Sequence, residues 1–154
     1  MSSLSAMTYE TVEASCLGKS GRPDEGDDAI FLGDHLCAVL DGVTSDSVCD
    51  CCALSAGRLA VDAVVKHLET MDPDTGLEEF LRDVRSTLTS WFGSHRVDEA
   101  GFAASAVVWN AARAELWFVG DCQAYVDGEQ VAFPKAIDEA AATVRSAVVR
   151  ARLL

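Results

Sequence analysis

Two short acidic stretches have the residue types and the spacing that a metal ion could use. The first, "EGDDAIFL", opens an apolar run with Asp27 and Asp28, and the second, "AVLDG", closes the next apolar run with Asp41 and Gly42. In an antiparallel hairpin the start of one strand lies beside the end of the next, so these carboxylates should lie close together. Mg²⁺ and Mn²⁺ prefer carboxylate and carbonyl oxygens, so the pattern favours a cation site at a sheet edge. A solvated acidic edge that discourages aggregation would give the same pattern.

The hydrophobic pattern predicts the elements that would position such a site. Residues 8–16 are typical of a strand, and "DAIFL" and "HLCAVL" around Gly33-Asp34 are typical of a hairpin. Apolar residues at helical spacing predict one helix over about 47–70 and a second over 77–92.

The second half of the chain returns to strand periodicity. The stretches "FAASAVVWN" and "AELWFVGD" predict a hairpin, and "QAYVDGEQVAF" predicts another around the turn signal Asp127-Gly128. A last amphipathic helix is expected over 137–153. This order predicts an α+β fold, an antiparallel β-sheet sandwich covered by helices, in a single domain spanning residues 1–154.

Composition and charge narrow the classes of partner. The chain has 25 acidic and 12 basic residues, a net charge of −13, and nucleic-acid binding needs a basic footprint. No apolar run approaches the length of a membrane span, and the N-terminus "MSSLSAMTYE" lacks the regions of a signal peptide. We therefore expect a cytoplasmic protein with neither a nucleic-acid nor a membrane partner.

Six cysteines would favour disulfides in a small secreted domain, but no secretion signal accompanies them. Cys49, Cys51 and Cys52 form a cluster, "CDCC". A zinc site would need a second pair of ligands at suitable spacing, and none follows. A zinc or redox module built on this cluster is therefore a minor alternative.

The order of these motifs resembles the metal-dependent Ser/Thr protein phosphatases of the type-2C, or PPM, family. That family has an arginine-containing loop, an acidic strand start, a strand ending in Asp-Gly, two helices, and a hairpin followed by "GDSR". This chain has, in the same order, "GRPDEGDDAIF", "AVLDGVTS", two predicted helices and "AASAVVWNAARAELWFVGDCQAY". The resemblance covers about residues 9–131 and implies an α-β-β-α sandwich.

The resemblance also implies a metal site. The family binds two Mg²⁺ or Mn²⁺ ions, and several residues of this chain match their ligands. Asp27 matches the first acidic metal-binding residue, and Asp28 matches the acid beside it. Asp41 matches the aspartate that bridges the two ions, and Gly42 matches the residue that offers its carbonyl oxygen. Asp121, in "GDCQ", matches the "GDSR" aspartate, which in some members helps to hold a further ion.

Arg22 would match the arginine that binds the substrate phosphate, although its spacing to Asp27 is one residue longer than usual. The chain also departs from the family at Thr44 and Ser45, where glycines are usual, and at Cys122-Gln123, which replace Ser-Arg. The two later metal-binding aspartates of the family have no counterpart here, so the domain is expected to be C-terminally short.

The implied activity is hydrolysis of a phosphoserine or phosphothreonine in a protein by a metal-activated water. Because the ligand set is incomplete, a catalytically impaired domain that binds a phosphoprotein or another partner is the main alternative. In the family the later segment also supplies sheet strands, so its absence is expected to leave a sheet edge unpaired, which predicts a homodimer.

Overall fold

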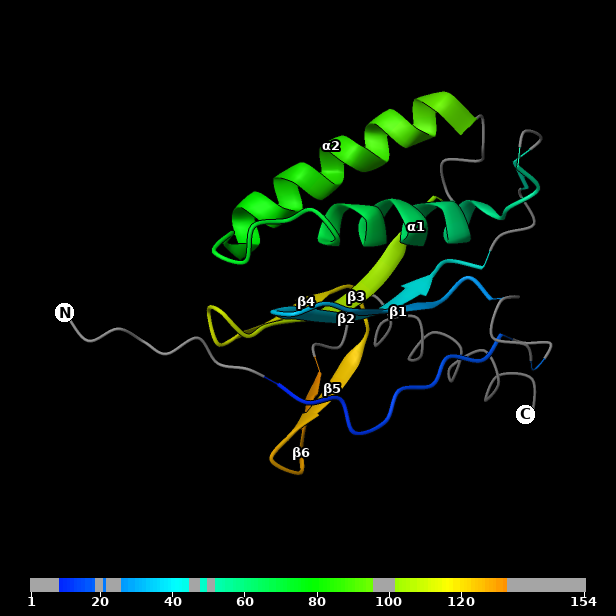
Figure 1. The fold of residues 1–154 in the computed structure, drawn as a ribbon. Coiled ribbons are helices and arrows are strands. Elements are labelled where there is room, and N and C mark those ends of the chain that lie inside the picture. The colour runs from blue at the N-terminus through cyan, green and yellow to red at the C-terminus, as the bar shows by residue number, and fades with distance from the viewer. Residues whose placement is uncertain are drawn as a thin grey trace, which may run out of the picture.

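The computed structural model of the chain describes residues 9–18, 21, 26–44, 48–49, 52–95 and 102–132 (Figure 1). Within these residues the elements in chain order are β1 (Ala29–Leu32), β2 (Leu36–Gly42), α1 (Ala56–Leu68), α2 (Leu77–His95), β3 (Ala104–Asn110), β4 (Glu115–Val119), β5 (Gln123–Val126) and β6 (Glu129–Ala132). Two helices with antiparallel strands confirm the prediction of an α+β fold.

Strands β1 to β4 form one antiparallel sheet in the order β1-β2-β3-β4. Helices α1 and α2 connect β2 to β3, and both lie on the same side of this sheet, which we call its inner face (Figure 1). The β5–β6 hairpin forms a separate two-stranded sheet and lies on the opposite side, the outer face (Figure 1). Its turn residues Asp127 and Gly128 have φ values of 53° and 83°, which suit the two-residue hairpin turn predicted from this pair.

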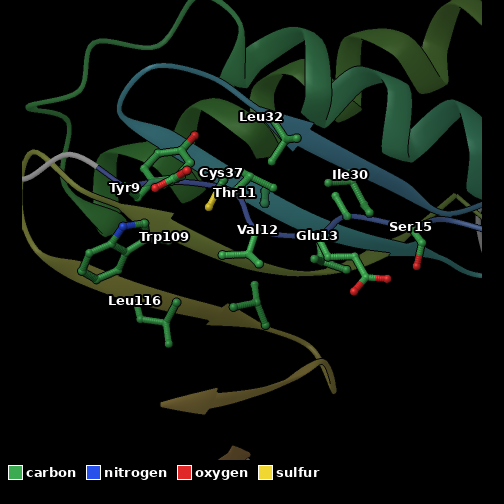
Figure 2. Close-up of a pocket in the computed structure, with 15 residues that line it drawn as sticks. Tyr9, Thr11, Val12, Glu13, Ser15, Ile30, Leu32, Cys37, Trp109 and Leu116 are labelled. Atoms are coloured by element: carbon green, nitrogen blue, oxygen red, sulfur yellow. The ribbon is translucent and has the colours of Figure 1, made fainter. Parts of the chain in front are cut away.

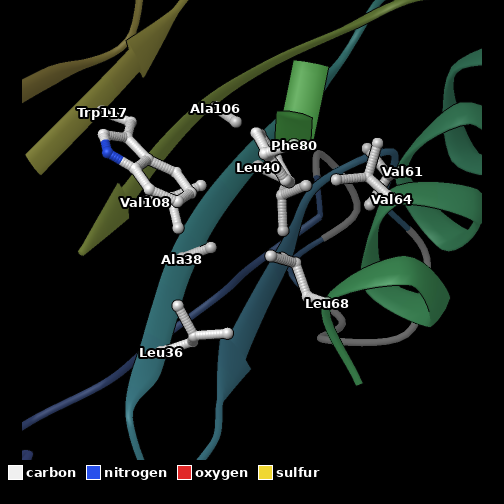
Figure 3. Packing of buried hydrophobic residues seen from close by; sticks show 10 residues of the cluster. All are labelled: Leu36, Ala38, Leu40, Val61, Val64, Leu68, Phe80, Ala106, Val108 and Trp117. Carbon is white, nitrogen blue, oxygen red and sulfur yellow. The ribbon is translucent and has the colours of Figure 1, made fainter. Parts of the chain in front are cut away.

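The main core lies between the inner face and the two helices. Alternate β2 residues Leu36, Ala38 and Leu40 are buried there, because successive side chains of a strand point to opposite faces. They pack with residues of α1, α2, β3 and β4, namely Val61, Val64, Leu68, Phe80, Ala106, Val108 and Trp117 (Figure 3). The Phe80 and Trp117 rings lie 5.3 Å apart between centroids, which is a favourable spacing for an aromatic pair.

Helix α1 begins later than the sequence pattern predicts. Val48 and Ser55 form an isolated antiparallel bridge, and the Cys49 amide donates to the Leu54 carbonyl at 2.8 Å. The loop thus closed includes Ala53 at φ 59°. Ser55 then accepts a hydrogen bond from the Arg58 amide at 3.0 Å, the contact expected of a helix N-cap. The prediction of a helix from residue 47 was therefore wrong by about two turns.

The strand predicted over residues 8–16 is also absent from the part of this segment that the structure describes. Residues 9–18 form no ladder with the sheet, although the Tyr9 hydroxyl donates to the carbonyls of Gly33 and Leu36. A strand pattern becomes a strand only where a neighbouring strand offers paired backbone groups. The helix predicted over 137–153 lies outside the described residues. Neither described helix is both long enough and apolar enough to cross a membrane.

Candidate functional site

The predicted acidic residues surround one small cavity at the end of the β1–β2 hairpin. Asp27, Asp28, Asp41 and Gly42 line this cavity, whose volume is about 190 Å³. The remaining lining residues are Leu17, Gly18, Gly26 and Thr44. The two acidic stretches that the sequence predicted to lie close together therefore do lie at one cavity.

Strand register explains how these residues meet. Ala29 pairs with Leu40 in the β1–β2 ladder, so continuing the ladder by one and two positions sets Asp28 beside Asp41 and Asp27 beside Gly42. Asp41 is exposed, whereas Gly42 is buried. The site therefore stands at the rim of the sheet, with one carboxylate open to solvent.

Gly42 lets helix α1 approach the end of β2. A Cβ at this position would overlap the Asp27 carbonyl oxygen and lie 2.9 Å from the Gly57 carbonyl oxygen. A Cβ on Gly57 would in turn overlap the Val43 carbonyl oxygen. These two glycines allow the first turn of α1 to pack directly on the strand that carries Asp41.

The helix start also holds the acidic turn in place. The Ser55 hydroxyl donates a hydrogen bond to the Asp27 carboxylate. Arg58, one turn further on, donates from Nη1 to the carbonyls of Gly26 and Asp28, each at 3.3 Å. Its Nε lies 2.8 Å from Asp62 Oδ1. Backbone and side chain of the acidic turn are thus both attached to α1.

Sequence reasoning did not identify Ser55 and Arg58. A serine immediately before a helix is a recognised N-cap signal, but it carried no weight while the helix was expected to begin at residue 47. The contact of Arg58 with the acidic turn left no such signal, because the carbonyls that it reaches are about 30 residues away in the chain.

Asp121 is connected to the same region through β3. Ser105 pairs with Asp41 in the β2–β3 ladder, and its hydroxyl donates to Asp121 Oδ1 at 2.6 Å. Asp121 does not line the acidic cavity. Arg22, the predicted phosphate-binding residue, lies outside the described residues, so the structure does not bear on its role.

The donor set matches a hard cation in type but is small in number. Three of the four polar side chains that line the cavity are carboxylates, the ligand type that Mg²⁺ and Mn²⁺ prefer, and the fourth is the Thr44 hydroxyl. Across the part of the chain that the structure describes, no three His, Cys, Asp or Glu residues are grouped closely enough to hold a metal ion. Mg²⁺ often binds through one or two carboxylates and keeps several waters, so Asp28 and Asp41 are compatible with such a site.

The cysteine cluster does not form a second candidate centre among these residues. Cys49 is 1% exposed and packs with Ala56 and Leu59 as part of a small core, so it acts as a buried apolar residue. Cys52 is exposed, and Cys51 lies outside the described residues. Cys52 carries a free thiol.

Comparisons of this chain with protein-family models, with curated proteins and with solved structures found no match.

Proposed function

We propose that this chain is a metal-dependent phosphoprotein phosphatase, acting on phosphoserine or phosphothreonine, with a PPM-type sandwich fold. The observation that carries the proposal is the cavity that Asp27, Asp28 and Asp41 share at one end of the β1–β2 hairpin. The order of the sequence motifs supports it independently. A cytoplasmic location remains part of the same proposal.

Asp27, Asp28, Asp41 and the Gly42 carbonyl are the groups that would hold Mg²⁺ or Mn²⁺. When bound, a divalent cation supplies a water molecule whose pKa is lowered toward neutrality, so that it can act as a hydroxide nucleophile. Ser55 keeps the Asp27 carboxylate oriented, and Asp121 is the residue that a further ion would use. No serine, cysteine or histidine nucleophile is required by this chemistry.

The charge of the cavity makes a cation necessary for this function. A phosphomonoester is a dianion near neutral pH, and three carboxylates line the cavity that it would enter. Repulsion would exclude the phosphate unless a bound cation reversed the local charge. Arg22 is the residue we propose for the opposite side of the phosphate, on the basis of the sequence resemblance.

The second candidate is a phosphatase-like domain that binds a phosphoprotein or another partner without hydrolysing it. The absence of a three-ligand group among the described residues favours this reading. A homodimer also remains a proposal, since β1 and β4 are the outermost strands of the described four-stranded sheet. Nucleic acid is not a proposed partner of either form.

Titration of Mn²⁺ into the full chain by calorimetry tests the site. Asp41→Asn is expected to weaken binding by more than about 100-fold, the upper end of what loss of an outer-shell partner costs. Asp27→Asn should weaken it less, because Asp41 is the proposed bridging ligand. Asp34→Asn is the matched control, since Asp34 is exposed at the other end of the same hairpin, and it should bind as the unmodified chain does.

Hydrolysis of a phosphothreonine peptide distinguishes the two candidates. Turnover that requires Mn²⁺ and stops in EDTA would support the phosphatase. Mn²⁺ binding without turnover would support the binding domain. Equal Mn²⁺ affinity in the unmodified chain and in Asp41→Asn would contradict the site assignment itself.

A further inference from the structure

The outer face of the four-stranded sheet is apolar. Ile30, Val39, Val107 and Leu116, one residue from each strand, line a groove of about 540 Å³ on this face (Figure 2). Val39 lies on β2, which has a neighbouring strand on each side, and its side chain is nevertheless 54% exposed on the outer face. An apolar groove with an exposed valine on its floor usually marks a surface that binds something.

The N-terminal segment borders this groove without filling it. Residues 9–15 cross the outer face and contribute to the groove lining (Figure 2). Tyr9 anchors the segment through its hydroxyl, which lies 2.9 Å from the Leu36 carbonyl oxygen. Val12 is 96% exposed, so its side chain covers none of the apolar floor.

The described chain ends beside the groove. Val126 and Val131, on β5 and β6, line a neighbouring cavity of about 640 Å³ together with Leu116. Leu116 also lines the outer-face groove. The β5–β6 hairpin lies on the outer side of the sheet (Figure 1), so residues 133–154 continue from a point next to the groove.

Charge complementarity favours this same segment as the occupant. Of the 12 bases and 25 acids in the chain, four bases and two acids lie in residues 133–154, which makes that segment +2 and the rest −15. The charged residues lining the groove are Glu10 and Glu13. A second copy, with a net charge of −13, would add repulsion instead.

We propose that residues 133–154 dock on the outer-face groove of their own chain. The expected helix over 137–153 has Ile137, Val144 and Val148 at helical spacing for contact with the floor. Seventeen residues of helix would span about 25 Å, close to the roughly 23 Å length of a seven-residue strand such as β2. Arg145 and Arg150 would then be available to Glu10 and Glu13 at the rim.

Photo-crosslinking in the full chain tests this docking. p-Benzoylphenylalanine is introduced at Val39, the protein is irradiated at micromolar concentration, and the monomer band is digested for mass spectrometry. We expect crosslinks to peptides from residues 133–154. The same probe at Arg82, an exposed side chain of α2 on the inner side of the sheet, should give no crosslink to that segment. Crosslinks between two copies, crosslinks confined to residues 9–15, or equal yields from both probe positions would overturn the proposal.

A matched pair of substitutions gives an independent measurement. Val148→Asp places a charge in the predicted apolar stripe, whereas Val149→Asp places it one position away. The readout is the alkylation rate of Cys37, which lines the groove, relative to the exposed Cys52 in the same molecule. We expect about a fivefold increase for Val148→Asp, as loss of a modest docking free energy implies, and no change for Val149→Asp. Equal rates in the two variants would contradict the proposal.

Discussion

The inner and outer faces of the four-stranded sheet are made by alternate residues of the same strands, yet they differ sharply in burial. On β2, Leu40 is fully buried on the inner face, whereas its neighbour Val39 is 54% exposed on the outer face. Both faces are apolar, so hydrophobicity alone does not explain the difference. The inner face is covered because α1 and α2 lie on it (Figure 1).

Side-chain size helps to decide which face of the sheet a helix covers. The inner face of β2 includes the small residues Ala38 and Gly42, and Gly42 meets Gly57 of α1 at a distance that no larger residue would allow. The acidic cavity lies beside the contact between Gly42 and Gly57, at the end of β2. Close packing of α1 therefore serves both the core and the candidate site.

The largest effect is expected in the free energy of unfolding when a valine is replaced by alanine on each face. Both substitutions delete the same two methyl groups. Val108→Ala, on the inner face, should lower the free energy of unfolding by about 2 to 3 kcal/mol through lost burial and the cavity left behind, since Val108 is fully buried. Val39→Ala should cost about 1 kcal/mol or less. Urea unfolding of both variants measures this difference. Equal costs would mean that the outer face is packed as tightly as the inner face.

A smaller effect is expected where α1 meets β2. Gly57→Ala should destabilise the fold by about 1 to 2 kcal/mol, because overlap with the Val43 carbonyl outweighs the gain of about 1 kcal/mol in helix propensity. Gly76→Ala is the control, since the nearest atom to its Cβ would be 3.8 Å away. Thermal unfolding compares the two. A stabilised Gly57→Ala variant would show that α1 can move away from the strand without cost.

The smallest effect concerns Glu115, on β4 at the sheet edge. Hydrogen bonds from Arg113 and then from the Trp117 indole lower the pKa of Glu115. A lowered folded-state pKa contributes stability that is present above the unfolded value of about 4.3 and is lost as the pH falls through the folded value.

The destabilisation caused by Glu115→Gln should therefore be measurable near pH 6. It should shrink as the pH falls below the pKa that Glu115 has in the unfolded chain. Solvent screening keeps it small, because both charged groups are partly exposed. Urea unfolding at several pH values follows the trend. A difference that stays constant with pH would exclude the Arg113–Glu115 pair as its source.

Much of the fold could be predicted from local pattern. The periodicity over 77–92 predicted α2, which extends to His95, and the turn pairs Gly33-Asp34 and Asp127-Gly128 predicted their hairpins. These predictions succeeded because each depends on residues close together in the chain. The strand predicted over 8–16 failed because pairing depends on a partner elsewhere.

The candidate site divides in the same way. The sequence alone predicted that Asp27 and Asp28 lie close to Asp41, because antiparallel pairing determines which strand ends meet. The attachment of Asp27 to Ser55, and of Asp121 to Ser105, could not be predicted, since each joins segments that periodicity does not relate.

By itself, the sequence determined the order of the helices and hairpins from β1 to β6, the acidic strand ends and the net charge of −13. Only the tertiary structure decided that α1 and α2 cover the face bearing Leu40 and leave the face bearing Val39 open. The physical reason is that β2 is apolar on both sides, so its pattern predicts a strand but does not select a face. That selection depends on the close approach of Gly57 to the end of β2, a contact between segments 15 residues apart.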